Sequence, residues 1–280
     1  MSSVPSRGRP KLLRANRVSY SYGSHPVLQE VDVQIPTGGL IGILGQNGSG
    51  KTTLLKLLAG LLKPSEGSVT LDDMDLAGFN RPKLARRLAV VPQETEIPFD
   101  YTVLELALMG RYPHLHPFEL EGPTDFKIAR QMLAATGTDH LEQRVYRTLS
   151  GGEKQRVVIA SALTQFAETP TGPNTGLTQV LLLDEPTSSL DLCFQLTTSK
   201  LLTELNLSQN TTIVLCTHDL NFAAGLCRDL VVLREGEVIA AGPTDTVLTP
   251  ETIRAAYGVI ADVHCRSTSS HPTVVPISSQ

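Results

Sequence analysis

The chain of 280 residues contains no tryptophan, and aromatic residues account for only 5% of it. So few aromatic side chains leave little material for the base-stacking platforms that bind single-stranded nucleic acid. The formal net charge is −4, so no overall positive field attracts a polyanion such as DNA or RNA. These two deficits predict a protein without a nucleic-acid partner.

Cysteine is also scarce, and no C-x-x-C pair occurs. The four cysteines are Cys193, Cys216, Cys227 and Cys265. Their spacing argues against a disulfide framework or a structural zinc site and is typical of a reducing compartment. No apolar run approaches the roughly 20 residues of a membrane-spanning helix, and the basic segment 1–17 lacks the apolar core of a signal peptide. We expect a soluble, cytosolic protein whose membrane role, if any, depends on a partner.

Short apolar segments alternate with amphipathic segments along most of the chain. The predicted strands are residues 40–44, 88–91, 180–183, 212–216 and 230–233, and the predicted helices include residues 52–59, 153–164 and 190–207. Strands that are apolar throughout indicate a sheet covered on both faces. Because helices separate them, we expect an α/β fold with a mostly parallel sheet.

A glycine-rich segment, GQNGSGKT, occupies residues 45–52 and matches the pattern G-x-x-x-x-G-K-[ST] between a predicted strand and a predicted helix. Its glycines let backbone N–H groups turn toward a polyphosphate, and the positive end of the helix dipole adds to the attraction. In this interpretation Lys51 reaches the β- and γ-phosphates, and the Thr52 hydroxyl ligates Mg²⁺. The candidate nucleotide-binding residues are Gly45, Asn47, Gly48, Ser49, Gly50, Lys51, Thr52 and Thr53.

An acidic pair, Asp184 and Glu185, follows the predicted strand 180–183. Ligands of parallel sheets bind at the carboxyl ends of the strands. We therefore expect Asp184 to hold Mg²⁺ and Glu185 to orient or polarise an attacking water. An isolated pair of this kind is more often a strand end before a turn, and Pro186 fits that alternative. The glycine-rich loop elsewhere in the chain favours the catalytic interpretation.

The segment LSGGE at residues 149–153 opens a predicted helix. Ser150 and Glu153 have the spacing of a capping box, which is sufficient as a structural explanation for those two residues. Gly151 and Gly152 are not needed for a cap. Because glycines let a ligand approach the exposed N–H groups of a helix end, they predict a second anion site.

Because LSGGE lies between the glycine-rich loop and the acidic pair in the chain, the sequence resembles the ATP-binding subunits of ABC transporters over roughly residues 12–258. The resemblance implies a P-loop NTPase core with an N-terminal antiparallel β portion and an inserted helical subdomain at about residues 95–165. It also leaves an N-terminal extension, residues 1–11, and a C-terminal tail, residues 259–280. The last dozen residues are rich in serine, and we expect them to form a frayed end without regular structure. A loop at residues 166–179 is longer than in most relatives.

The resemblance also assigns roles to single residues. It implies that Tyr22 stacks on adenine and that Gln93 contacts Mg²⁺ and the attacking water. Asp191, with Ser189 and Leu190, matches the D-loop, and His218 matches the switch histidine that contacts the γ-phosphate. The implied catalytic residues are therefore Glu185, His218 and Gln93, and the implied metal ligands are Thr52, Gln93 and Asp184.

For partners, the resemblance implies a second copy of the chain that sandwiches two ATP molecules, transmembrane permease subunits and, indirectly, a substrate-binding protein. This places the chain at the cytoplasmic face of the membrane. The segments 98–105 and 109–114 resemble importers of iron–siderophore complexes, heme and cobalamin, and the insertion at 166–179 favours heme among them. Two alternatives are a DNA-maintenance ATPase, disfavoured because no heptad repeat is present, and a non-hydrolysing regulator, disfavoured by Glu185 and His218.

Overall fold

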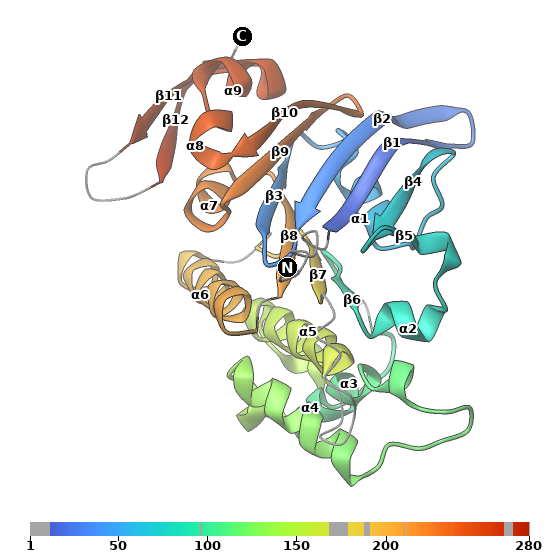
Figure 1. Ribbon diagram of the computed structural model, residues 1–280. Helices are drawn as coiled ribbons and strands as arrows, with labels where there is room; N and C mark the ends of the chain where they lie inside the picture. Colours follow the sequence, from blue (N-terminus) through green and yellow to red (C-terminus); the bar gives the residue numbers. More distant parts are fainter. Residues whose placement is uncertain are drawn as a thin grey trace, which may run out of the picture.

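A computed structural model of the chain describes residues 12–95, 97–167, 179–187, 191–209, 211–265 and 271–279. Within these ranges a six-stranded sheet occupies the centre of the molecule, with a four-stranded sheet beside it (Figure 1). A group of helices projects from the end of the sheet that carries β6 and β7. The N-terminal extension and residues 168–178 of the expected insertion lie outside the described residues.

The larger sheet is parallel except at one edge. Its strands, in spatial order, are β10 (Glu237–Pro243), β9 (Asp229–Arg234), β3 (Leu40–Leu44), β8 (Thr212–Thr217), β7 (Val180–Asp184) and β6 (Leu88–Val91). Only β10 and β9 pair antiparallel. The five strands predicted from apolar runs are all present, each within one residue of its expected bounds. The mostly parallel sheet is therefore confirmed.

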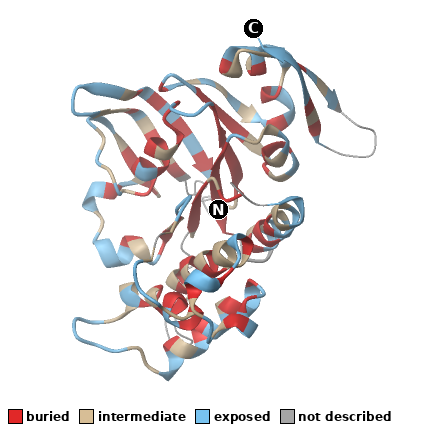
Figure 2. Ribbon diagram, turned by 180° about the vertical axis from the view of Figure 1, so that it is seen from behind, coloured by how far each residue is buried: buried red, intermediate tan, exposed pale blue. Residues whose placement is uncertain are grey.

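Both faces of the parallel part of this sheet are buried, as the continuous apolar strands indicated. In β3, Leu40 and Leu44 belong to one apolar cluster, whereas Ile41 and Ile43 belong to another, because successive side chains of a strand point to opposite faces. The first face is covered by α5 (Gly151–Phe166), α6 (Leu192–Gln209) and α7 (Leu220–Leu226), and the second by α1 (Lys51–Leu58). Figure 2 shows the buried residues gathered in these layers.

The N-terminal antiparallel sheet is confirmed as well. Its strands, in spatial order, are β2 (His25–Pro36), β1 (Leu12–Tyr22), β4 (Glu66–Leu71) and β5 (Met74–Asp75), and α2 (Arg81–Ala85) follows them in the chain. Leu13, Val18 and Leu28 of this sheet share an apolar cluster with Leu54 of α1. Helix α1 is therefore held between the two sheets, which fixes the loop that precedes it.

The projecting helices have a core of their own. They are α3 (Val103–Met109), α4 (Pro123–Ala135) and the neighbouring part of α5, which bury Val103, Ala107, Leu133 and Val157 together. The guanidinium of Arg111 is fully buried beside them. It donates to Asp125 Oδ1 at 2.8 Å and to the Thr164 carbonyl at 3.0 Å, which ties the loop after α3 to α4 and α5.

The end of the chain differs from the expected frayed tail. After α8 (Thr244–Val247) and α9 (Pro250–Tyr257), the strands β11 (Val259–Cys265) and β12 (Pro272–Ser279) form an antiparallel hairpin. Asn221 of α7 holds it, because its side chain donates to the Val274 carbonyl at 3.1 Å and accepts from the Val274 N–H at 2.8 Å. The serine-rich composition concealed the alternation that buries Ala261 and Val274.

Helix bounds match the sequence pattern closely. The helices predicted at residues 52–59, 153–164 and 190–207 begin and end within two residues of α1, α5 and α6. Among the described residues, no helix combines the length and the apolar composition needed to cross a bilayer.

Candidate active site

The glycine-rich loop between β3 and α1 needs its glycines for backbone conformation. Gly45, Gly48 and Gly50 have φ angles of 153°, 82° and 101°, which L-residues rarely adopt. A Cβ on Gly45 would lie 2.4 Å from the Leu233 carbonyl oxygen, and one on Gly50 would lie 2.6 Å from the Leu28 side chain. A Cβ on Gly48 would meet nothing within 4 Å, so the loop is open on that side.

The polar groups of this loop fit a polyphosphate. The buried ammonium group of Lys51 donates to the carbonyls of Gly45 and Gln46 at 2.9 and 3.0 Å, so it lies within the curl of the loop. The Ser49 hydroxyl is buried and has no hydrogen-bond partner among the described residues. Bound phosphate oxygens would accept from both groups and from the N–H groups at the start of α1.

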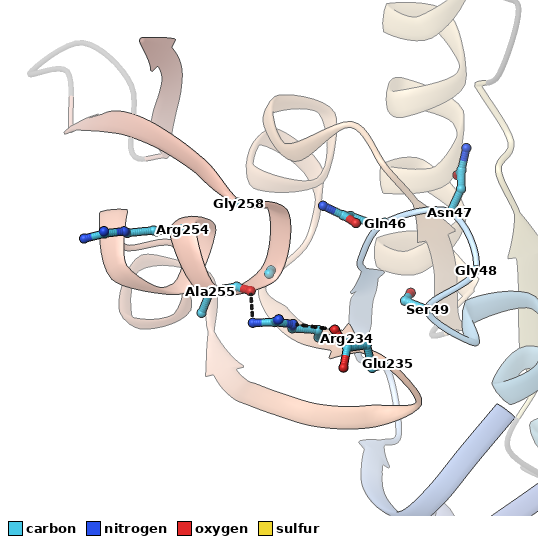
Figure 3. Close-up of a pocket in the computed structure, with 10 residues that line it drawn as sticks. Gln46, Asn47, Gly48, Ser49, Arg234, Glu235, Arg254, Ala255 and Gly258 are labelled. Carbon is cyan, nitrogen blue, oxygen red and sulfur yellow. Dashed lines mark hydrogen bonds and ion pairs between the residues drawn. The ribbon is translucent and has the colours of Figure 1, made fainter. Parts of the chain in front are cut away.

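Elements near the C-terminus form hydrogen bonds with the glycine-rich loop, which the sequence did not indicate. The Gly236 N–H, in the turn between β9 and β10, donates to the Ser49 carbonyl at 3.2 Å. The side chain of Gln46 donates to the Tyr257 carbonyl at the end of α9, at 2.8 Å. Figure 3 shows this side of the loop, where Arg234 lies between Ser49 and α9. These contacts restrain the loop independently of any ligand.

Asp184 and Thr52 form the second part of the site. The Thr52 hydroxyl donates to Asp184 Oδ1 at 3.2 Å, so the end of β7 faces the start of α1 as expected. Burial raises the pKa of Asp184 above its ordinary value, and the hydrogen bond from Thr52 opposes that rise. A hydroxyl and a carboxylate oxygen are ligands that Mg²⁺ prefers, and a cation here would stabilise the charged form of the carboxylate. The residues present therefore fit Mg²⁺.

Three further side chains converge at the carboxyl ends of adjacent parallel strands. Gln93 follows β6, Glu185 follows β7 and His218 follows β8. Glu185 Oε2 accepts from Gln93 Nε2 at 3.4 Å and lies 3.2 Å from His218 Nδ1. The backbone of Glu185 is left-handed, with φ 44°, and its N–H donates to the Cys216 carbonyl at 2.9 Å. The predicted catalytic residues are thus brought together.

The phosphate loop, Gln93 and Glu185 line the same pocket, of about 440 Å³. Its lining residues are Val27, Asn47, Gly48, Gly50, Lys51, Thr52, Thr53, Gln93 and Glu185. A lysine, a hydroxyl and a carboxylate on one wall can bind a triphosphate and hold a water beside its terminal phosphate.

The capping box at the start of α5 is present. The Ser150 hydroxyl accepts from the Glu153 N–H at 3.4 Å, and the Glu153 carboxylate accepts from the Ser150 N–H at 2.8 Å. Gly151 is exposed. Gly152 is buried, and a Cβ on it would lie 2.3 Å from the ring of Phe194, so packing alone requires this glycine. The sequence patterns did not identify Phe194 as part of this site, although it stands only three positions after Asp191.

Ser150, Gly151 and Gly152 do not line the pocket beside Lys51. Neither does Tyr22, which ends β1 with 48% of its surface exposed and packs edge-to-face on Tyr20. The Asp191 carboxylate accepts from the Phe194 N–H at 3.0 Å and so caps α6. Ser189 and Leu190 lie outside the described residues.

Comparison with known proteins is consistent across sequence and structure. The family described as "ABC transporter" matches residues 28–188. The hemin import ATP-binding protein HmuV of Gloeobacter violaceus is 39% identical over 96% of this chain and 95% of its own length. The ferric enterobactin transport ATP-binding protein FepC of Escherichia coli is 36% identical over 95% and 94%. The cobalamin import ATP-binding protein BtuD of Halobacterium salinarum is 38% identical over 90% of this chain and 60% of its own.

Two solved structures are similar in fold. One is described as a metal-chelate type ABC transporter in an inward-facing conformation; it has a TM-score of 0.81 and 30% identity over 96% of this chain and 98% of the other. The second is a dimeric, post-hydrolysis state of the ATP-binding cassette MJ0796 bound to ADP and Pi, with a TM-score of 0.68 and 28% identity over 82% and 98%.

Proposed function

Because the chain belongs to the ABC transporter family, whose ATP-binding subunits hydrolyse ATP, we propose that it energises an importer of an iron complex, with heme as the cargo. The observation that carries the hydrolytic part is the position of Glu185, between Gln93 and His218 at the pocket lined by Lys51. Relatives named for hemin import, matched over nearly their whole length, support the cargo.

Each residue of the proposed site has its own role in ATP binding or hydrolysis. Lys51 and the N–H groups of the glycine-rich loop hold the β- and γ-phosphates. Thr52 and Asp184 hold Mg²⁺, which neutralises charge on the phosphates when bound. Glu185 orients the attacking water and accepts its proton. Gln93 and His218 keep that carboxylate in place and reach toward the terminal phosphate. Tyr22, exposed at the end of β1, stacks on the adenine.

The helix end at Ser150 and Gly151 serves a second copy of the chain. Gly151 is exposed there, at the positive end of a helix dipole, yet this helix end does not line the pocket of its own chain. In a head-to-tail pair, this end meets the γ-phosphate bound by the other copy, and Asp191 lies beside the junction. ATP then bridges the two copies, and hydrolysis weakens the bridge.

The remaining parts connect the ATPase to its partners. We propose an ATP-binding domain over residues 12–258, in which the helices of residues 95–165 contact transmembrane permease subunits. The chain then lies at the cytoplasmic face of the membrane, and a substrate-binding protein delivers cargo from the other side. Residues 1–11 and 259–280 flank this domain. Movement of the helices relative to the sheet transmits the state of the nucleotide to the permease.

The function is tested in two stages. The purified chain should hydrolyse ATP in the presence of Mg²⁺, and duplex DNA should not stimulate it; a large stimulation would favour a DNA-maintenance ATPase. Cells lacking the gene should then lose growth on hemin as the sole iron source. Parallel cultures supplied with a ferric siderophore, or with cobalamin where it is required, test the alternatives that the FepC and BtuD relatives suggest. A defect confined to either culture would overturn heme as the cargo.

A further inference from the structure

The ring of Phe194 fills the space beneath the first turn of α5. A Cβ added to Gly152 would lie 2.3, 2.6 and 2.7 Å from three carbons of this ring, so the ring and the glycine backbone are in direct contact. One turn along α5, the guanidinium carbon of Arg156 lies 5.7 Å from the ring centroid. The ring therefore contacts Gly152 and Arg156, which share one face of α5.

The position of Phe194 is itself fixed by Asp191. The Asp191 carboxylate accepts from the Phe194 N–H at 3.0 Å, and the Asp191 carbonyl accepts from the Gln195 N–H at 3.0 Å. These two hydrogen bonds fix the start of α6, which begins at Leu192. A set of contacts thus runs from Asp191, through Phe194, to Gly152 and Arg156 of α5.

We propose that Phe194 is a positioning residue for the α5 end: it holds Gly151 and Gly152 where their N–H groups meet the triphosphate bound by a second copy. This inference rests on the proposed function, since it assigns a positioning residue to the same helix end. Phe194 does not line the pocket beside Lys51. It acts through Gly152, and the absence of a side chain at Gly152 is what lets the ring approach the backbone so closely.

A double-mutant cycle tests the contact. Gly152→Ala should force the ring away from α5 and lower both ATP-dependent dimerisation, measured by light scattering, and kcat about tenfold. Phe194→Ala removes the ring and should lower the same two quantities by loosening the helix end. In the Phe194→Ala background, Gly152→Ala should have little further effect, because the added methyl group no longer meets the ring. ATP affinity of the monomer should stay unchanged in all three variants.

Thermal unfolding of the nucleotide-free proteins provides a second readout of the same cycle. Gly152→Ala should lower the unfolding temperature in the wild-type background and much less in the Phe194→Ala background. Phe194→Tyr, which keeps the ring, should retain wild-type dimerisation. Leu207→Ala is the control, because Leu207 lies on the same helix with 75% of its surface exposed.

The outcomes separate the inference from the function. If the effects of Gly152→Ala and Phe194→Ala multiply independently, or if Phe194→Ala dimerises and turns over as wild type, the positioning role is wrong while the ATPase stands. If Phe194→Ala changes only the unfolding temperature, the ring is structural and the inference is again wrong. If the wild-type chain binds no ATP, the proposed function itself fails. If Phe194→Ala does not fold, Phe194→Leu replaces it in the cycle with the same criteria.

Discussion

The Nδ1 atom of His218 lies 3.2 Å from Oε2 of Glu185, and Gln93 donates to the same oxygen at 3.4 Å. One carboxylate oxygen is therefore contacted by residues that follow β6 and β8, the two strands on either side of β7. This arrangement fixes the orientation of the Glu185 side chain at the mouth of the pocket that Lys51 lines. A carboxylate held in this way is suited to receive a proton from water.

Glu185→Gln should separate ATP binding from hydrolysis. Glutamine has nearly the same shape but cannot accept the proton, so kcat should fall about 100-fold or more while ATP affinity is kept. Unhydrolysed ATP should then hold two copies together, which light scattering with ATP and Mg²⁺ would detect as a doubled mass. Glu237→Gln, at an exposed position on β10, is the control. Rapid turnover by a monomeric Glu185→Gln protein would contradict the role.

Lys51→Ala should weaken ATP binding itself. The buried ammonium group supplies charge-assisted hydrogen bonds to the phosphates, and their loss should reduce ATP affinity by about 10- to 100-fold. The substitution removes the two hydrogen bonds from Lys51 to the loop, but those from Gly236 to Ser49 and from Gln46 to Tyr257 remain, so the fold should persist. Isothermal titration measures the affinity and circular dichroism the fold. Lys56→Ala, at an exposed position on the same helix, should bind ATP normally.

The site residues that the sequence identified are each defined by a short local pattern. Asp184 and Glu185 follow an unbroken apolar strand, and residues 45–52 lie between a strand and a helix, so short stretches of sequence define them. The support of the loop could not be predicted, because the hydrogen bond from Gln46 to Tyr257 joins residues separated by 211 positions. The reason for Gly152 could not be predicted either. The segment LSGGE suggests that this glycine gives a ligand access, whereas in the structure the ring of Phe194 on α6 leaves no room for a side chain.

Asp184→Asn should change how stability depends on pH. Burial raises the pKa of Asp184 in the folded protein, so the folded state holds this proton more tightly than the unfolded state does. At neutral pH the charged carboxylate therefore lowers the free energy of unfolding. As the pH falls through the raised pKa, Asp184 takes up a proton and the free energy of unfolding rises again. The asparagine variant, without nucleotide, should unfold at a higher temperature than wild type at pH 7.

That advantage should shrink as the pH falls through the raised pKa of the folded protein, and it should be smallest below the pKa of the unfolded state. Thermal unfolding of both proteins over a pH series measures it, with Asp245→Asn, an exposed position, as the control. The same Asp184→Asn variant should lose the enhancement of ATP binding by Mg²⁺. A constant difference in unfolding temperature across the series would show that the cause is packing and not charge.

Ser150→Ala distinguishes a helix cap from a phosphate site. Loss of the hydroxyl removes the hydrogen bond from the Glu153 N–H, which should lower the free energy of unfolding by about 1 kcal/mol. If Ser150 were only a cap, kcat would stay close to that of wild type. If the helix end also binds the γ-phosphate of a second copy, kcat should fall far more than the stability change accounts for.

Gly151→Asp is the sharper test of the same helix end. Gly151 is exposed and has no left-handed φ, so aspartate fits the backbone, and a carboxylate in the first turn interacts favourably with the helix dipole. The same carboxylate would repel a triphosphate. We expect a folded protein that binds ATP at its own glycine-rich loop but neither dimerises with ATP nor hydrolyses it. Gly151→Ala adds bulk without charge and should retain more activity. Wild-type turnover by Gly151→Asp would show that residues 150–152 act only as a helix cap.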